Sequence, residues 1–324
     1  MTLERPSVGD VRDAFQGEQI AIAAVVVLYH PDLMLLERLL TSLKGQVDRV
    51  VAVDNTPGSS VTLAPFLEGF PCPISYLPLG DNKGIAEAQN IGIREGIRGG
   101  CSHVLLLDQD SAVSAGMVTN LLFGEKQLLE KEHVVAAVCP QIVDEKTGKR
   151  PGAVHYRWFR VRRIDVSTDS DEPIETDNLI ASGSLIRAVV LESLGMMRSD
   201  LFIEYVDTEW VFRANTAGYK SYCVPTAVLA HNFGDASAKF FGHPIYLYSG
   251  IRYYYKLRNA VYLARVKSMG WQWRAYIISR IPYHFFLYSW FSANRLCTAR
   301  LMLRALGDGL LGRLGPVRKE LTTK

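Results

Sequence analysis

Cysteine is scarce, and the sequence arranges none of it for a zinc site or a disulfide framework. The five cysteines include no C-x-x-C pair, and their odd number is typical of a protein that stays in a reducing compartment. The net charge is only +3 over 324 residues, so no overall positive field favours nucleic-acid binding. These absences predict a cytoplasmic protein that does not bind nucleic acid.

Long apolar runs are missing as well. Residues 21–28 are apolar but only about as long as a strand, whereas a membrane-spanning helix needs ~20 such residues. Residues 276–291 are apolar and aromatic, but Arg280 and Pro282 interrupt them, so we interpret this segment as an interfacial or buried helix. Acids precede any apolar run in residues 1–18, which we interpret as a polar leader rather than a signal peptide.

The sequence does contain an alternation of apolar strands and amphipathic helices over residues 19–245. Short polar connections join them, which predicts an α/β domain with a mostly parallel central sheet flanked by helices. Ligands of such sheets bind beyond the carboxyl ends of the strands. We expect strands at 22–28, 49–53, 74–77, 103–107, 134–138 and 222–229, helices at 31–43, 85–97 and 113–129, and a hairpin or loop over the site within 144–177.

Two acids follow the fourth expected strand, in the sequence Asp108-Gln-Asp110. Side chains two residues apart in extended backbone point to the same side, and two bare carboxylates would repel a diphosphate. A hard divalent cation would remove this repulsion, because Mg²⁺ typically binds one or two carboxylates together with substrate phosphates. The alternative is a turn in which Asp110 or Ser111 caps the following helix.

Polar residues also follow the other strands. Asp54, after the second strand, could accept hydrogen bonds from a ribose or a base, or begin an Asx turn. Tyr29, after the first strand, could line a nucleoside pocket or belong to a helix-capping loop. Asn82-Lys83-Gly84 enters a helix whose N-terminus could favour phosphate, or forms a tight turn. It matches neither G-x-G-x-x-G nor G-x-x-x-x-G-K-[ST], so a dehydrogenase or a P-loop nucleotidase is not supported.

The segment from Glu204 to Glu209 supplies carboxylates that could take a proton from a hydroxyl. Glu204 and Asp207 share a helix face at i, i+3, whereas Glu209 is expected to pair with Arg213 at i, i+4. Solvated acids on an amphipathic helix are the alternative. His231 could ligate a metal or contact phosphate, although a lone histidine is more often structural.

Residues 246–324 are basic and aromatic, with Asp308 and Glu320 as their only acids. Arg258 could clamp a diphosphate, or it could lie on an ordinary helix surface. We expect this region to be helical from Ile245 onward and compatible with an anionic membrane surface.

Taken in order, these segments resemble the family 2 inverting glycosyltransferases with the GT-A fold, and most of all their rhamnosyltransferase branch. The resemblance spans residues from about 20 to 260 and depends on the order and spacing of its motifs. The matching segments are Val26–Pro31, Val53–Asn55, Asn82–Ala86, Asn90–Gly92, Leu107–Ser111, Ala181–Gly183, Phe202–Arg213, His231 and Arg258–Asn259.

The resemblance implies roles for the residues at the strand ends. Asp54 would bind the nucleoside, and Asp108 would contact the ribose or phosphate. Asp110 would hold Mg²⁺ or Mn²⁺. His231 and Arg258 would lie near the diphosphate.

The resemblance also implies that Asp207 is the catalytic base. Val206 stands where the family usually has a glutamate, so Glu204 and Glu209 remain alternatives.

The implied function is the transfer of a sugar from a nucleotide donor, with dTDP-L-rhamnose implied by the branch. The acceptor would be a hydroxyl of a glycan or glycolipid in bacterial surface polysaccharide or rhamnolipid synthesis. The C-terminal helices of such enzymes often lie on the cytoplasmic face of the inner membrane, where lipid-linked acceptors reside. The alternatives are a sugar nucleotidyltransferase, which would carry a basic glycine-rich loop where this chain has Tyr29-His-Pro-Asp, and a non-catalytic membrane-peripheral binding protein.

Overall fold

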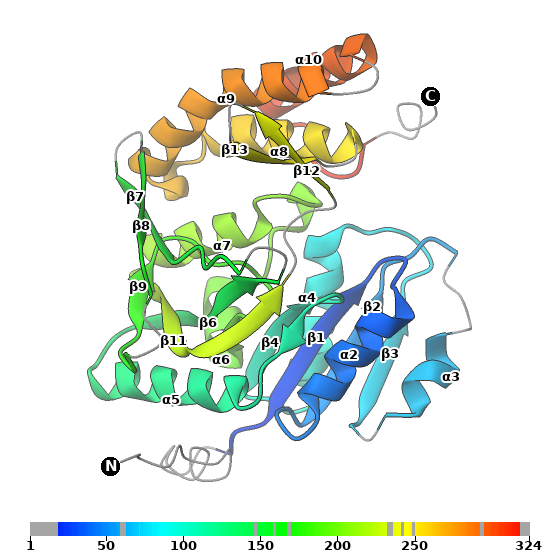
Figure 1. Ribbon diagram of the computed structural model, residues 1–324, viewed down its shortest axis with the longest axis vertical. Coiled ribbons are helices and arrows are strands. Elements are labelled where there is room, and N and C mark those ends of the chain that lie inside the picture. The colour runs from blue at the N-terminus through cyan, green and yellow to red at the C-terminus, as the bar shows by residue number, and fades with distance from the viewer. Residues whose placement is uncertain are drawn as a thin grey trace.

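The computed structural model describes most of the chain, and Figure 1 shows its course. The described residues are 19–58, 63–70, 72–145, 148–157, 160–166, 170–231, 236–240, 243–247, 250–291 and 295–317. At residues 231, 236–240, 243–247, 250, 288 and 291 the description covers the backbone alone. The expected polar leader, residues 1–18, lies outside the described residues.

A nine-stranded sheet forms the centre of the molecule (Figure 1). Its order is β3-β2-β1-β4-β10-β6-β11-β5, with β9 paired to β11. The six long strands run in one direction, and the short β5, β9 and β10 run against their neighbours, which confirms the predicted α/β fold. The strands are β1 (Ile22–Leu28), β2 (Arg49–Asp54), β3 (Ile74–Pro78), β4 (His103–Asp108), β5 (Ala112–Val113), β6 (Val135–Asp144), β9 (Ile174–Thr176), β10 (Leu185–Arg187) and β11 (Lys220–His231).

Helices cover both faces of this sheet (Figure 1). One core joins alternate residues of the strands to α2 and α5, and the other joins the remaining residues to α4, α7 and the C-terminal helices. Leu263 and Trp273 belong to the second core, so α8 and α9 pack on the same body as the sheet. The helices are α2 (Leu33–Leu43), α3 (Leu63–Glu68), α4 (Ile85–Arg98), α5 (Met117–Glu130), α6 (Ala188–Leu194), α7 (Val206–Thr216), α8 (Gly250–Leu263), α9 (Trp271–Phe291) and α10 (Arg295–Leu311), with 3₁₀ turns η1 (Ser199–Leu201) and η2 (Lys267–Met269).

The chain after β11 differs from the helix expected from Ile245 onward. It first forms a hairpin of β12 (Ala236–Phe240) and β13 (His243–Leu247), and α8 begins only at Gly250. Proline and β-branched residues in β13 favour extended backbone over helix. The expected hairpin within residues 144–177 is present as β7 (Ala153–Arg157) and β8 (Arg160–Ile164).

Helix α9 contains the apolar segment with Pro282 inside it. Among the residues that the structure describes, no helix combines the length and hydropathy required to span a bilayer.

Candidate active site

The carboxyl edge of the sheet brings Asp54 and Asp108 to the two sides of β1. In the strand register Leu28 is opposite Asp54 and Val27 is opposite Asp108. Two strand spacings separate the acids, which places their Cα atoms about 10 Å apart. Because Val27 and Leu28 point to opposite faces, so do the two acids. The acids therefore share an edge, as the sequence indicated, but not a face of the sheet.

The loop that carries Asp108 and Asp110 is held from both sides. Ser182 Oγ accepts the Asp108 N–H at 3.0 Å and lies 2.8 Å from Ser111 Oγ. Gln109 exchanges two hydrogen bonds with the backbone of Tyr29, at 2.8 and 3.1 Å. The loops after β1 and β4 are therefore joined, and the Tyr29 side chain in the first of them is exposed. Ser182 and Gln109 lie in segments that carry the family resemblance, but the sequence alone gave them no role; the serine inside the apolar stretch before β10 was a signal.

Asp54 is fully buried, and both of its oxygens bond within the protein. Oδ1 accepts the Thr56 N–H at 3.0 Å, and Oδ2 accepts the Tyr76 hydroxyl at 2.7 Å. Burial, together with the Asp54 carboxylate, raises the pKa of Tyr76, so the phenol stays a donor. The carboxylate therefore forms the Asx turn that was the alternative at this position, and the expected nucleoside contact stays a prediction.

The residues that lead into α4 form a turn that side-chain hydrogen bonds hold in place. Asn82 Oδ1 accepts from Gly84 N at 2.9 Å and from Asn55 Nδ2 at 3.0 Å, and Asn55 Oδ1 accepts from Lys83 N at 2.7 Å. Gly84 has φ +85°, and a Cβ there would meet the Phe202 carbonyl at 2.6 Å. Asn82 and Gly84 therefore shape the turn, and the half-exposed Lys83 ammonium lies 3.7 Å from the Asp81 carboxylate.

Asp207 lies in the first turn of α7 with its carboxyl largely withdrawn from water. Its Oδ1 accepts the Thr208 N–H at 2.7 Å, and the Ala181 backbone also bonds to it. Burial raises the pKa of Asp207 to about 6, the Thr208 and Ala181 hydrogen bonds offset part of this rise, and the charge of Glu204 adds to it. A carboxyl with such a pKa is suited to accept a proton near neutral pH.

The two other acids of this segment bond to cations. Glu209 is buried and forms the expected i, i+4 pair with Arg213, at 3.1 Å. Glu204 pairs with Arg252 and, at 3.8 Å, with Lys256. Their carboxylates are committed to these partners, so the geometry favours Asp207 as the base.

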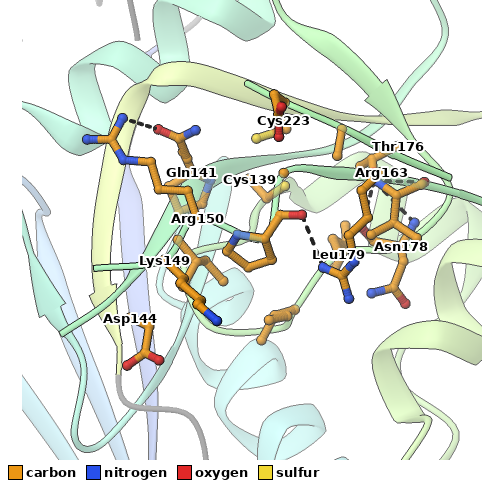
Figure 2. Close-up of a pocket in the computed structure, with 18 residues that line it drawn as sticks. Cys139, Gln141, Asp144, Lys149, Arg150, Arg163, Thr176, Asn178, Leu179 and Cys223 are labelled. Atoms are coloured by element: carbon orange, nitrogen blue, oxygen red, sulfur yellow. Dashed lines mark hydrogen bonds between the residues drawn. The ribbon is translucent and has the colours of Figure 1, made fainter. Parts of the chain in front are cut away.

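A cavity of about 500 Å³ lies between β6, β11 and the β7–β8 hairpin (Figure 2). Asn178, Leu179 and Ile180 form one wall, and Thr208 Oγ1 donates to Asn178 Oδ1 at 3.3 Å. The cations at the cavity are Lys149, Arg150 and Arg163, of which Arg150 bonds to Gln141 and Arg163 to the Pro151 carbonyl (Figure 2).

The last two expected site residues have different positions. His231 ends β11 beside Asp144 of β6, and its side chain lies outside the described atoms. Arg258 is buried, and its guanidinium donates to the carbonyls of Leu201 and Gly315 and to Asn259 Oδ1. The guanidinium thus donates to three groups inside the protein, and the expected diphosphate contact of Arg258 stays a prediction.

Asp108 and Asp110 fit a hard divalent cation by the chemistry of their donors. Both carboxylates are partly exposed at the edge of the sheet. Within the described ranges no group of three or more His, Cys, Asp or Glu side chains converges on one point. Mg²⁺ needs no such cage, because substrate phosphates and water complete its shell.

A mostly parallel sheet covered by helices, with two carboxylates at the carboxyl edge of its strands, is the architecture of the GT-A nucleotide-sugar transferases. The chain belongs to glycosyltransferase family 2, because the model of the family "Glycosyl transferase family 2" matches residues 24–195, more than half of the chain. It is therefore an inverting hexosyltransferase.

The chain is similar in sequence to one named transferase, and its fold is similar to that of two solved structures. The chain is 34% identical over 244 residues to "dTDP-rhamnosyl transferase RfbF" of Shigella flexneri, covering 75% of this chain and 80% of that protein. Its fold is similar to that of S. aureus TarS 1-349 in complex with UDP-GlcNAc, with a TM-score of 0.55, 13% identity, and coverage of 90% of this chain and 80% of that one. It is also similar to GalNAc-T7 with UDP, GalNAc and Mn²⁺, with a TM-score of 0.56, 14% identity and coverage of 83% of this chain, which spans 57% of that structure.

Proposed function

We propose that this enzyme transfers L-rhamnose from dTDP-L-rhamnose to a hydroxyl of a glycan or glycolipid. The donor is supported by the identity to a protein named for dTDP-rhamnosyl transfer. One observation supports the placement of the reaction. The five-residue segment 178–182 lines the cavity with its first three residues, bonds Asp207 through Ala181 and holds the Asp108 loop through Ser182.

In this proposal the acceptor occupies the cavity and the donor lies along the Asp108 side of segment 178–182. Asp207 takes the proton of the acceptor hydroxyl, whose oxygen attacks the anomeric carbon from the side opposite the nucleoside diphosphate. Asp108 and Asp110 would hold Mg²⁺ or Mn²⁺, which neutralises the charge of the departing diphosphate. Tyr29 offers an aromatic face and Lys83 a cation to the donor.

The test of this proposal is an assay of sugar transfer from a panel of nucleotide sugars to sugar and glycolipid acceptors. We expect dTDP release with dTDP-L-rhamnose, and faster release when an acceptor is added. Release of pyrophosphate from dTTP and a sugar 1-phosphate would instead indicate a nucleotidyltransferase.

Filling the cavity is expected to weaken acceptor binding alone. Leu179 is buried in the cavity wall, and Leu179→Trp would replace it with a larger, aromatic side chain. Losing about 2 kcal/mol of acceptor contact would raise the acceptor KM about 30-fold, with the donor KM unchanged. Equal changes in both constants would contradict this position for the acceptor.

We also propose that the C-terminal helices contact an anionic membrane surface. Helices α9 and α10 lie together at one end of the molecule (Figure 1). Each has exposed apolar side chains at helical spacing, with exposed arginines among them. The apolar residues are Ile278, Phe286 and Trp290 on α9 and Leu296, Leu303 and Leu310 on α10. Such a surface suits the headgroup region of a bilayer.

Co-sedimentation with lipid vesicles tests this contact. We expect binding to phosphatidylglycerol vesicles but little to phosphatidylcholine, and Phe286→Ser should lower the partition coefficient by about tenfold. Phe123→Ser is the matched control, because Phe123 is an exposed phenylalanine on α5. If both substitutions have the same effect, the proposed contact is wrong.

A further inference from the structure

The backbone just before α7 has an unusual conformation. Phe202, Glu204 and Tyr205 have φ angles of +68°, +68° and +62°, in a region that side chains with a Cβ rarely adopt. At Phe202 ψ is −62°, and Ile203 N donates to Leu201 O at 2.8 Å. These values describe the strained form of the γ-turn. Such a conformation persists only when its surroundings hold it, and it occurs most often at functional sites.

The Asn259 side chain of α8 provides the main hold on this strained loop. Its single Nδ2 lies 3.0 Å from Leu201 O, 2.8 Å from Ile203 O and 3.0 Å from Glu204 O. Asn259 is fully buried, so water does not replace these bonds. One amide therefore bonds carbonyls on both sides of the γ-turn.

Arg258 fixes the direction in which that amide points. Its Nε donates to Asn259 Oδ1 at 2.9 Å, which turns the Nδ2 group toward the loop. Its Nη2 donates to Leu201 O at 2.9 Å, a carbonyl that Asn259 also bonds. The guanidinium lies 4.9 Å from the centre of the Tyr255 ring, which in turn stacks on Phe202 at 4.8 Å.

Further contacts place the same loop between α8 and α4. Arg252 and Lys256, at spacings of seven and three residues before Asn259, face the loop and pair with Glu204. On the other side Phe202 O accepts the Ala86 N–H, and Gly84 leaves room for that carbonyl. These contacts hold the loop from both sides, and Asp207 stands two residues after Tyr205, in the first turn of α7.

We infer that Arg258 and Asn259 are positioning residues that hold the strained 201–205 loop and thereby aim Asp207 at the acceptor. This inference depends on the proposed role of Asp207 as the base. It gives the Arg-Asn pair a function in the rate of transfer rather than in binding the diphosphate. Without the amide the loop relaxes toward ordinary φ angles, and the Asp207 carboxyl moves from its place beside Ala181.

The test is Asn259→Ala, studied through rate and pH dependence together. We expect kcat to fall about 100-fold, because a displacement of ~1 Å at a reacting group has an effect of that size. The donor KM should not change, and the acidic midpoint of the pH–rate profile should move as the surroundings of Asp207 change. Asn120→Ala is the matched control, since Asn120 also donates its amide to a carbonyl, at 2.7 Å from Thr226 O, and should keep its rate and midpoint.

A second variant addresses the possibility that Asn259→Ala does not fold. Glycine adopts positive φ without a Cβ clash, so in a Tyr205→Gly background the loop needs less support. Asn259→Ala should therefore lower the unfolding temperature and kcat by less in the Tyr205→Gly background than in the wild-type background. Equal losses in both backgrounds contradict the inference. The inference is also contradicted if Asn259→Ala keeps the full rate and an unchanged pH midpoint while Asp207→Asn loses activity. That outcome would leave the proposed function unaffected, because Asp207 would still act as the base.

Discussion

Replacing Asp207 with asparagine is expected to reduce kcat by about 100- to 10,000-fold, the range that a general base contributes. Asparagine keeps the shape of the side chain, and its Oδ1 can still accept the Thr208 N–H. It removes the capacity to accept the acceptor's proton. The dissociation constant of the donor, measured by calorimetry with Mg²⁺, should stay near the wild-type value because Asp207 does not contact the diphosphate in the proposed arrangement.

Glu209→Gln is the matched control for this substitution. Glu209 stands two residues later in the same helix, and its carboxylate is bound to Arg213. Its loss should lower the unfolding temperature and leave the rate per folded molecule unchanged. If Asp207→Asn keeps near wild-type turnover, or if Glu209→Gln loses it, the base has been assigned to the wrong residue.

The pH dependence of transfer reports on the same carboxyl. Only the ionised carboxylate accepts a proton, and the pKa of Asp207 is raised from 3.8 to about 6. The rate should therefore fall as the pH drops through about 6. Glu204→Gln removes a negative charge that raises this pKa and leaves Arg252 and Lys256 without their partner. The acidic midpoint should consequently move to lower pH in that variant.

The sequence predicted the sheet better than the site, because the spacing of apolar residues shows which side chains of a strand or helix are buried and which face they lie on. The fully buried strand Ile22–Leu28 has the predicted bounds, and α4 differs from the predicted helix by one residue at its end. Sequence order also placed Asp54 and Asp108 at one edge. It did not show that the pleat turns them to opposite faces, since this depends on which residues of β1 they pair with.

The sequence did not show which side chains from distant segments would bond to the candidate site residues. Arg258 resembles a phosphate ligand in sequence, but Leu201 and Gly315 occupy its donors from 57 residues away on either side. Asp54 forms an Asx turn with Thr56 through one oxygen, and its other oxygen accepts from Tyr76 of the neighbouring strand. Local patterns cannot report such long-range hydrogen bonds. The strain at Phe202 was equally hidden, because no glycine marks it in the sequence.

Replacing Asp110 with asparagine is expected to weaken metal-dependent donor binding by about 100-fold, because one of two carboxylate ligands to the cation is lost. The sign of the effect depends on the metal. A nucleoside diphosphate is itself negative, so without a divalent cation the removal of one carboxylate lessens repulsion and should leave affinity equal or higher. Calorimetric titration of dTDP with and without Mg²⁺ measures both arms.

Asp81→Asn is the control for this Mg²⁺-dependent change in donor affinity. Asp81 lies in the turn before α4 and is mostly exposed, and asparagine there also removes one negative charge without changing shape. If the Asp110 effect were only the loss of a local charge, both variants would behave alike, with no dependence on Mg²⁺. If the affinity for dTDP falls only in Asp110→Asn and only when Mg²⁺ is present, the Asp110 carboxylate binds the cation directly. Equal affinities of wild type and Asp110→Asn in Mg²⁺ would remove Asp110 from the proposed metal site.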